Sequence, residues 1–423
     1  AGAEHLFMHA SPYGALAHDE GKRILVEGKG VWVKDIDGNW FIDALAGLWL
    51  VNVGHGRAEI GEAIARQAST LAYASSTSAT TIPAIQLAER LAAITPGDQN
   101  TVFFCSGGSK RQKVIGRRGS YHGGTYAAMS VSGTRPTSDP FHSPFMPGVL
   151  HASPPNCYRC DFRLTYPGCD LLCADQIGQM IEYENPQTVA AVIAEPISAA
   201  NGIVVPPDGY WQRVREICDK HGVLLITDEV INGFGRTGKM FASEHWGLVG
   251  DMMTMAKGLT SGYVPMGGVM CRPHVVEAFA DKNTLSHLIT YGGHPVAAAA
   301  ALANLDIIER EGLVQNAAKM GALLLEGVRG LADKHPSIGD VRGLGLIAGI
   351  EVVKDRASKE KFSESGPELQ ALNEGLRKRG LLTRAGTIIN LCPPLCISAD
   401  EVQQIVDIVD GALSDMEKVA GMA

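Results

Sequence analysis

The stretch VLLITDE, residues 223–229, decides the fold of this chain. Its five consecutive apolar or β-branched residues are typical of a strand that is buried on both faces of a sheet, and two carboxylates follow where that strand ends. The preceding residues 209–221 have the apolar spacing of a helix, and residues 189–194 form another continuous apolar run. This alternation of strand, helix and strand predicts an α/β protein with a mostly parallel sheet covered by helices.

The composition indicates an ordinary globular protein of more than one domain. The chain has 423 residues, 45% hydrophobic and 19% charged, and its length favours two or three domains. Its net charge of −8 disfavours a nucleic-acid partner. No apolar run approaches the ~20 residues of a membrane span. Nine scattered cysteines, and a start that lacks the pattern of a signal peptide, lead us to expect a cytoplasmic location.

The flanking parts of the chain differ in character from the alternating middle. Asp37-Gly38 between two alternating apolar runs predicts a β-hairpin over residues 30–42. Further along, the pattern predicts helices at 297–309 and 315–332, strands at 344–353 and 388–391, and a last helix that opens with the capping box Ser398-x-x-Glu401. We therefore expect a large domain over residues 56–296 and a smaller α+β domain over residues 297–423, to which the N-terminal segment 1–55 also belongs.

Chemically versatile side chains follow four of the predicted strands. These are Glu195 after 189–194, Asp228 after 223–227, Lys257 after 252–255, and Tyr121-His122-Gly123 after 113–116. Because ligands bind beyond the carboxyl ends of parallel strands, we expect these side chains to lie at one edge of the sheet. A run of small residues, Gly107-Gly108-Ser109, follows another strand end and has the composition of a phosphate-binding cup.

The combination favours pyridoxal phosphate (PLP) as a cofactor, although each residue alone has an ordinary structural explanation. Lys257 alone fits a strand-end lysine that reaches water, Asp228 a turn residue, and Tyr121 a half-buried loop aromatic. Together they match what PLP needs: a cup for its phosphate, a carboxylate for its pyridinium nitrogen and an aromatic ring to stack on. Desolvation would lower the pKa of Lys257 and free its amine to form a Schiff base.

Four longer motifs resemble the class III aminotransferases, which are PLP-dependent enzymes of fold type I. The motifs are AEPI (194–197), ITDEVINGFGRTGKMFASEHWG (226–247), MTMAKGLTSGYVPMGG (253–268) and TYGGHPVAAAAALANL (290–305). The resemblance extends from about residue 28 to the C-terminus. It implies a large domain with a seven-stranded, mostly parallel sheet beside a smaller α+β domain.

The resemblance also implies roles for individual residues. Lys257 would form the Schiff base and shuttle a proton, Asp228 would bind the pyridine nitrogen, and Val230 and Tyr121 would contact the two faces of the ring. Thr290 would reach the phosphate of the neighbouring subunit, because in this family two active sites share a dimer interface. We expect a homodimer, with a tetramer as the alternative. The full expected cofactor-binding set, with no metal, is Gly107, Gly108, Ser109, Tyr121, His122, Gly123, Glu195, Asp228, Val230, Lys257 and Thr290.

On the substrate side, the motif AGLWLVNVGHGR (46–57) resembles the ω-transaminase subgroup. There Leu48 and Trp49 would line the substrate pocket together with Tyr121. Arg384 in LLTRAG matches a mobile arginine whose planar guanidinium would bind the carboxylate of pyruvate or an amino acid. The resemblance therefore implies ping-pong transfer of an amino group from an amine or ω-amino acid to pyruvate, which leaves as alanine.

Other reactions stay open at this stage. Aminomutases and a decarboxylase share this scaffold, and β-alanine, taurine, diamines and aryl amines all remain as donors. The stretch GFGRTGK, residues 233–239, also matches a dinucleotide fingerprint and a Walker A loop, which would indicate a nucleotide-binding protein. Against that alternative, Met240 stands where a Walker loop has serine or threonine, and no clean amphipathic helix follows.

Two further features of the sequence need an explanation. Cys157, Cys160, Cys169 and Cys173 have the spacing C-x2-C-x8-C-x3-C, which fits either a structural zinc site or four free thiols in a surface excursion. In addition, Ser109 is joined directly to Lys110, although the family has a helix after the phosphate cup. Either the protein lacks that helix or the sequence omits a segment here. We favour the omission, because a helix N-terminus supplies the amides and the dipole that hold a phosphate.

Overall fold

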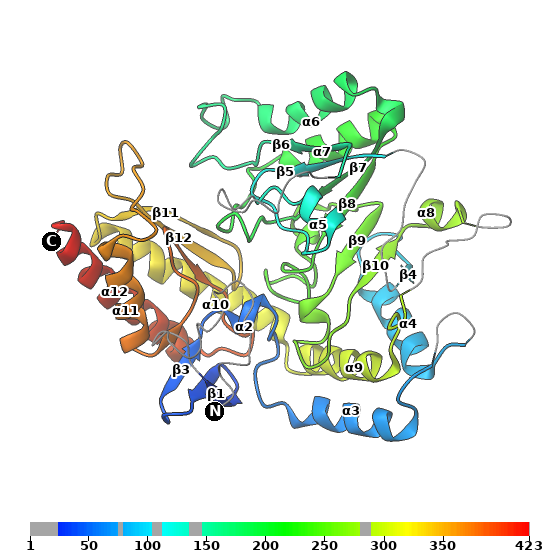
Figure 1. Ribbon diagram of the computed structural model, residues 1–423, viewed down its shortest axis with the longest axis horizontal. Helices are drawn as coiled ribbons and strands as arrows, with labels where there is room; N and C mark the ends of the chain where they lie inside the picture. The colour runs from blue at the N-terminus through cyan, green and yellow to red at the C-terminus, as the bar shows by residue number, and fades with distance from the viewer. Residues whose placement is uncertain (1–23, 75–78, 104–111, 135–145, 280–288, 423) are drawn as a thin grey trace.

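The computed structural model describes residues 24–74, 79–103, 112–134, 146–279 and 289–422. Within these ranges a seven-stranded sheet and its helices form one side of the molecule, and a smaller unit with its own three-stranded sheet forms the other (Figure 1). No helix in the described ranges combines the length and the apolar character that crossing a membrane requires.

The large sheet has the strand order β4-β10-β9-β8-β7-β5-β6. Strand β10 pairs antiparallel with β4 and β9, and the other neighbours pair in parallel. The strands are β4 (Thr101–Phe103), β5 (Lys113–Arg117), β6 (Val149–Ala152), β7 (Val189–Ala194), β8 (Leu224–Asp228), β9 (Met252–Met255) and β10 (Gly268–Cys271). This confirms the predicted α/β fold with a seven-stranded, mostly parallel sheet. The parallel strands β5, β7, β8 and β9 end at one edge, where the candidate residues follow them.

Helices α6 (Leu172–Tyr183) and α7 (Tyr210–His221) pack against each other beside the sheet (Figure 1). Their apolar faces form a second core that includes the fully buried Trp211. Helix α7 begins one residue after the predicted start, because Gly209 has a φ of 79° and stands as its N-cap. It ends at His221, and the following Gly222, with a φ of 59°, closes the last turn as a left-handed cap.

A second group of helices packs together elsewhere in the large unit: α9 (Pro295–Arg310) contacts α3 (Ala58–Thr70) and α4 (Ile82–Ile94). Helix α9 also contacts η5 (Lys257–Leu259), the short turn that contains Lys257. The short helices are α2 (Ala46–Trp49), α5 (Tyr126–Val131), α8 (Pro273–Glu277), η3 (Pro186–Thr188), η4 (Ala242–Trp246) and η6 (Leu331–Asp333).

The N-terminal strands β1 (Leu25–Lys29), β2 (Trp32–Asp35) and β3 (Trp40–Asp43) form an antiparallel meander. The hairpin predicted at Asp37-Gly38 is confirmed, and Gly38 has the φ of 90° that such a turn requires. The short β13 (Leu381–Leu382), from far along the chain, then joins β3 in parallel. The domain boundaries themselves stay a prediction.

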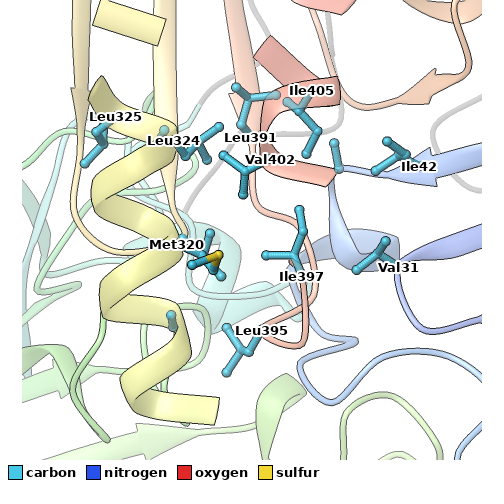
Figure 2. Packing of buried hydrophobic residues seen from close by; sticks show 14 of the residues in the cluster. Val31, Ile42, Met320, Leu324, Leu325, Leu391, Leu395, Ile397, Val402 and Ile405 are labelled. Atoms are coloured by element: carbon cyan, nitrogen blue, oxygen red, sulfur yellow. The ribbon is translucent and has the colours of Figure 1, made fainter. Parts of the chain in front are cut away.

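The smaller unit is built on β11 (Ile338–Gly343), β12 (Ala348–Val352) and β14 (Ile388–Leu391). Helices α10 (Leu313–Gly330), α11 (Pro367–Lys378) and α12 (Ala399–Ala420) complete it. Figure 2 shows how the core joins α10, α12 and the N-terminal strands through residues such as Met320, Val402 and Ile42. The predicted capping box of α12 is present, because Ser398 and Glu401 exchange hydrogen bonds.

One predicted element of this unit was wrong. Residues 344–353 form no single strand: β12 begins only at Ala348, after a turn in which the Leu344 amide donates to the Ile347 carbonyl at 3.0 Å. The turn forms because Gly345 has a φ of 60° and lies directly against the Thr237 backbone, where a Cβ would have no room.

Candidate active site

The structure brings Asp228, His122, Glu195 and Lys257 to the carboxyl edge of the large sheet, as the strand-end pattern predicts. Asp228 ends β8 and is buried. One of its oxygens, Oδ2, lies 2.6 Å from His122 Nδ1, and the other accepts the Val230 amide at 3.0 Å. Burial alone would raise the pKa of Asp228, but the hydrogen bond and charge of His122 outweigh it and lower that pKa below its ordinary value. Asp228 is therefore a buried, ionised carboxylate.

His122 is the partner that keeps this charge in place. Its side chain is almost fully buried. Burial lowers the pKa of His122, yet the hydrogen bond to Asp228 and the nearby charge of Glu195 raise it above its ordinary value. The ring nitrogen Nε2 has no hydrogen-bond partner among the described residues. The expected contact of His122 with the cofactor stays a prediction, and the geometry adds its bond to Asp228.

Lys257 follows β9 at the start of η5 in a left-handed conformation with a φ of 41°. Burial lowers the pKa of its amine, and the charge of Asp228 opposes that shift only in part. Lys257 Nζ lies 5.6 Å from the centre of the Trp49 ring. A desolvated amine, a nearby carboxylate and an aromatic wall thus meet at one place.

The loop that contains Lys257 is held by two asparagines that the sequence pattern did not identify. Asn304 of α9 donates from Nδ2 to the carbonyls of Gly258 at 2.9 Å and Leu259 at 3.0 Å. Asn52 lies against Gly258 so closely that a Cβ there would meet it. An asparagine within the alanine-rich helix 297–309 was the one visible signal for this contact.

Glu195 supports the loop that carries Tyr121. Its carboxylate forms a buried ion pair of 3.0 Å with Arg117 and accepts the Tyr121 amide at 3.2 Å. Tyr121 itself is half exposed, so part of its side chain is accessible. Glu195 therefore fixes the backbone of the Tyr121 loop, and Arg117 is a buried partner that the sequence pattern did not identify.

The remaining predicted residues lie further out or outside the described ranges. Leu48, Thr290 and Arg384 are exposed, and the carbonyl of Thr290 accepts the Tyr73 hydroxyl at 2.9 Å. The backbone carbonyl of Arg384 accepts the Asn390 amide at 3.0 Å. The expected cup residues Gly107, Gly108 and Ser109, and the Ser109–Lys110 junction, lie outside the described residues.

The stretch 233–239 is no phosphate loop in the structure. Arg236 at its centre is fully buried and donates to the carbonyls of Leu346 and Pro393 and to Asn52 Oδ1. The loop folds back through a bond from the Gly235 amide to the Met240 carbonyl at 3.1 Å, and only the short 3₁₀ turn η4 follows. Its central cation therefore binds protein groups from two other parts of the chain.

The four clustered cysteines, Cys157, Cys160, Cys169 and Cys173, line one small cavity and are not joined by disulfides. Burial raises the pKa of Cys173 to about 12 and also raises that of Cys157. In the described part of the chain no three His, Cys, Asp or Glu side chains are arranged to hold a metal ion. The geometry thus gives no support to the zinc hypothesis.

Comparisons with known proteins agree with this geometry. Residues 13–413 match the family model of aminotransferase class III. The putrescine–pyruvate aminotransferase of Pseudomonas aeruginosa is 37% identical, covering 92% of this chain and 90% of its own.

Two solved structures have the same fold over almost the whole chain. A thermostable (S)-enantioselective ω-transaminase from Thermomicrobium roseum has a TM-score of 0.92 and 40% identity, covering 98% of this chain and 97% of its own. The ω-transaminase of Pseudomonas jessenii in complex with PMP has a TM-score of 0.93 and 36% identity, covering 99% of this chain and 98% of its own. With the buried lysine and carboxylate at the sheet edge, these matches establish that the chain belongs to the class III aminotransferases.

Proposed function

We propose that this enzyme is a PLP-dependent ω-transaminase that moves an amino group from an amine or ω-amino acid to pyruvate. The convergence of the Lys257 amine and the Asp228 carboxylate carries the proposal, because these are the two groups that pyridoxal chemistry requires. The names of the relatives support pyruvate as the acceptor, since one of them is a putrescine–pyruvate aminotransferase. An aminomutase or decarboxylase is the alternative.

The residues present fit PLP. The buried, ionised Asp228 is suited to hold a proton on a pyridine nitrogen, and the Val230 side of the same turn offers an apolar contact. When bound, the cofactor would supply an electron sink that stabilises negative charge at the carbon next to the amino group. The P. jessenii neighbour, which was solved with PMP, supports the same choice.

Lys257 is suited to two tasks in this site. Because burial lowers the pKa of its amine, a larger fraction is unprotonated and able to attack an aldehyde or to accept a proton. Its φ of 41° and the two bonds from Asn304 to the following carbonyls hold the backbone while the side chain moves. Trp49 covers the amine from one side and would limit which donors fit and how much water enters.

The exposed predicted residues have a place in the same proposal. Arg384 would bind the carboxylate of pyruvate through its guanidinium and turn away when a donor has no carboxylate. Thr290 would contribute to the phosphate site of a partner subunit in a homodimer. The exposed ring of Tyr291, packed beside Tyr73 near Thr290, supports an apolar subunit contact there. We propose a cytoplasmic location, because nine cysteines scattered through a long chain are typical of proteins from a reducing compartment.

A donor panel tests this function. Purified enzyme loaded with PLP is mixed with pyruvate and, in turn, β-alanine, taurine, putrescine or an aryl amine, and the alanine formed is measured. We expect alanine from at least one donor, none with Lys257→Ala, and unchanged rates with Lys239→Met, which removes an exposed lysine. Release of carbon dioxide, or an isomerised amino acid without alanine, would favour the decarboxylase or aminomutase alternative instead.

A further inference from the structure

A strained turn carries the proposed substrate wall. Directly after β3, Ala46 has a φ of 47°, Gly47 of 68° and Trp49 of 59°. A left-handed conformation costs a residue other than glycine on the order of 1 kcal/mol or more, and it persists only where the surroundings enforce it. Ala46 and Trp49 are two such residues within four positions, so this turn needs an external support.

The carboxylate of Asp43 supplies that support. Its Oδ2 accepts the Gly47 amide at 2.7 Å and the His55 Nε2–H at 2.8 Å, and its Oδ1 accepts the Leu45 amide at 3.3 Å. Asp43 is 5% exposed and stands at the end of β3, where it is paired with Leu382 of β13. Hydrogen bonds to a buried carboxylate are stronger than those between neutral groups, so one fixed side chain holds the first half of the turn, at Leu45 and Gly47.

The 46–49 turn determines where the Trp49 side chain lies. The indole is buried in a small core with Ile197, Ile347 and Cys392, and the Lys257 amine lies 5.6 Å from its ring. The ordinary alternative conformations of Ala46 and Trp49, with negative φ, would turn the indole out of this core. The position of Trp49 over the amine therefore depends on the bonds that Asp43 accepts.

We propose that Asp43 is a positioning residue for the amine-donor pocket: by holding the 46–49 turn in its left-handed conformation, it keeps the Trp49 indole over Lys257. The inference rests on the proposed function, because Trp49 matters as a substrate wall only if an amine binds there. Asp43 touches neither the amine nor the expected ring, so it acts through Trp49. It should therefore affect the choice and rate of donors more than the binding of the cofactor.

A double-mutant cycle measures this dependence. The value of kcat/KM for the best donor is compared in the wild type, Asp43→Asn, Trp49→Ala and the double variant, all loaded with PLP. An asparagine keeps the shape but loses one of the two acceptor oxygens, so we expect Asp43→Asn to lower kcat/KM by roughly 10- to 100-fold. In the Trp49→Ala background the same change should cost less than about twofold, because no indole remains to be placed. A loss of equal size in both backgrounds would overturn the proposal.

Matched variants separate positioning from damage to the fold. Asp37→Asn makes the same chemical change at an exposed position of the neighbouring hairpin and should leave kcat/KM unchanged. Gly47→Ala disturbs the same turn without changing Asp43, since a side chain is strained at a φ of 68° while neighbouring atoms lie no closer than 3.3 Å. If Asp43→Asn does not fold, Gly47→Ala serves in the same cycle with the same expectation.

A readout without catalysis keeps the two proposals separable. In a crystal structure of PLP-loaded Asp43→Asn we expect Ala46 and Trp49 to regain negative φ and the indole to leave Lys257. An unchanged turn would refute the role of Asp43 even if the wild type transaminates every donor. Conversely, a relaxed turn in an enzyme that makes no alanine would leave the role of Asp43 standing and reject the proposed transamination.

Discussion

At the scale of single residues, the pair of Asp228 and His122 is the feature that the proposed chemistry depends on most. Asp228→Asn removes the buried charge but keeps the size of the side chain, so the 2.6 Å contact with His122 loses its ionic character. We expect kcat/KM to fall by about 10²–10³-fold, the usual cost of removing one preorganised electrostatic contact. Steady-state kinetics at saturating PLP would check this, and a loss below threefold would contradict the assigned role.

Glu229, next to Asp228, predicts a pH dependence of stability. Burial raises the pKa of Glu229 to about 7, although the amides of Ser243 and Ala242 donate to its carboxylate and oppose the shift. Between pH 4.5 and 7 the unfolded chain releases this proton and the folded protein keeps it. The folded state then binds more protons, so the contribution of Glu229 to the free energy of unfolding declines as the pH rises through this window. Above pH 7 both states are ionised and the contribution is constant.

Replacing the carboxyl isolates this effect. In Glu229→Gln the free energy of unfolding should decline less between pH 5 and pH 8 than it does in the wild type. The expected difference between the two declines is about 2–3 kcal/mol. Urea unfolding at both pH values measures it. Parallel pH profiles of the two proteins would show that Glu229 is already ionised when buried. Replacing the exposed Glu326 by glutamine serves as a control and should leave the profile unchanged.

The sequence predicted where the site residues lie better than what they contact. Asp228 and Lys257 could be found because each directly follows an apolar run that becomes a parallel strand. The contacts of Glu195 could not, because its partner Arg117 stands 78 positions earlier and only the adjacent pairing of β5 and β7 brings them together. Local patterns report which edge of a sheet a residue occupies, whereas side-chain pairing depends on strand order.

At the scale of elements, helix α9 holds the loop that carries Lys257, the proposed Schiff-base residue. Asn304 lies fully buried on α9 and bonds the two carbonyls that follow Lys257. Asn304→Leu keeps the helix but leaves both carbonyls without a donor, which costs about 1–3 kcal/mol for each buried group. We expect a lower melting temperature and a fall in kcat with little change in KM, because the amine loses its position and the donor pocket keeps its walls.

A matched substitution distinguishes this contact from a general loss of polar groups. Asn373→Leu removes an exposed asparagine of α11 that bonds only the Leu369 carbonyl of its own helix, so stability and kcat should stay close to wild type. Thermal unfolding and steady-state kinetics of the two variants give the comparison. Equal effects of both substitutions would rule out a special role for Asn304.

Element boundaries followed the sequence where local chemistry determines them. Strands 189–194, 252–255 and 388–391 have the predicted bounds, and the capping box starts α12 where expected. The turn at 344–347 was missed because its cause is remote: Gly345 must admit the Thr237 backbone of the large unit. A continuous apolar run does not indicate which other part of the chain will pack against it.

At the scale of the whole molecule, Arg236 joins three separate parts of the chain. It extends from the loop after β8 and donates to Asn52 of the N-terminal segment and to Leu346 and Pro393 of the smaller unit. The active site lies against the same junction, because Asn52 also donates to the Phe234 carbonyl at 3.0 Å and lies against Gly258, next to Lys257. A single buried guanidinium therefore couples the two units of Figure 1 at the point where the site is built.

This coupling predicts how the molecule unfolds. Arg236→Met keeps most of the volume but leaves three acceptors without their donor, a loss on the order of 3 kcal/mol at the junction. We expect one cooperative calorimetric transition in the wild type and a broadened or divided transition in the variant, as the smaller unit separates first. Lys239→Met, an exposed change in the same loop, should keep the single transition. If Arg236→Met lowers the melting temperature but unfolds as sharply as the wild type, then the shared apolar core of Figure 2 couples the units and Arg236 only adds stability.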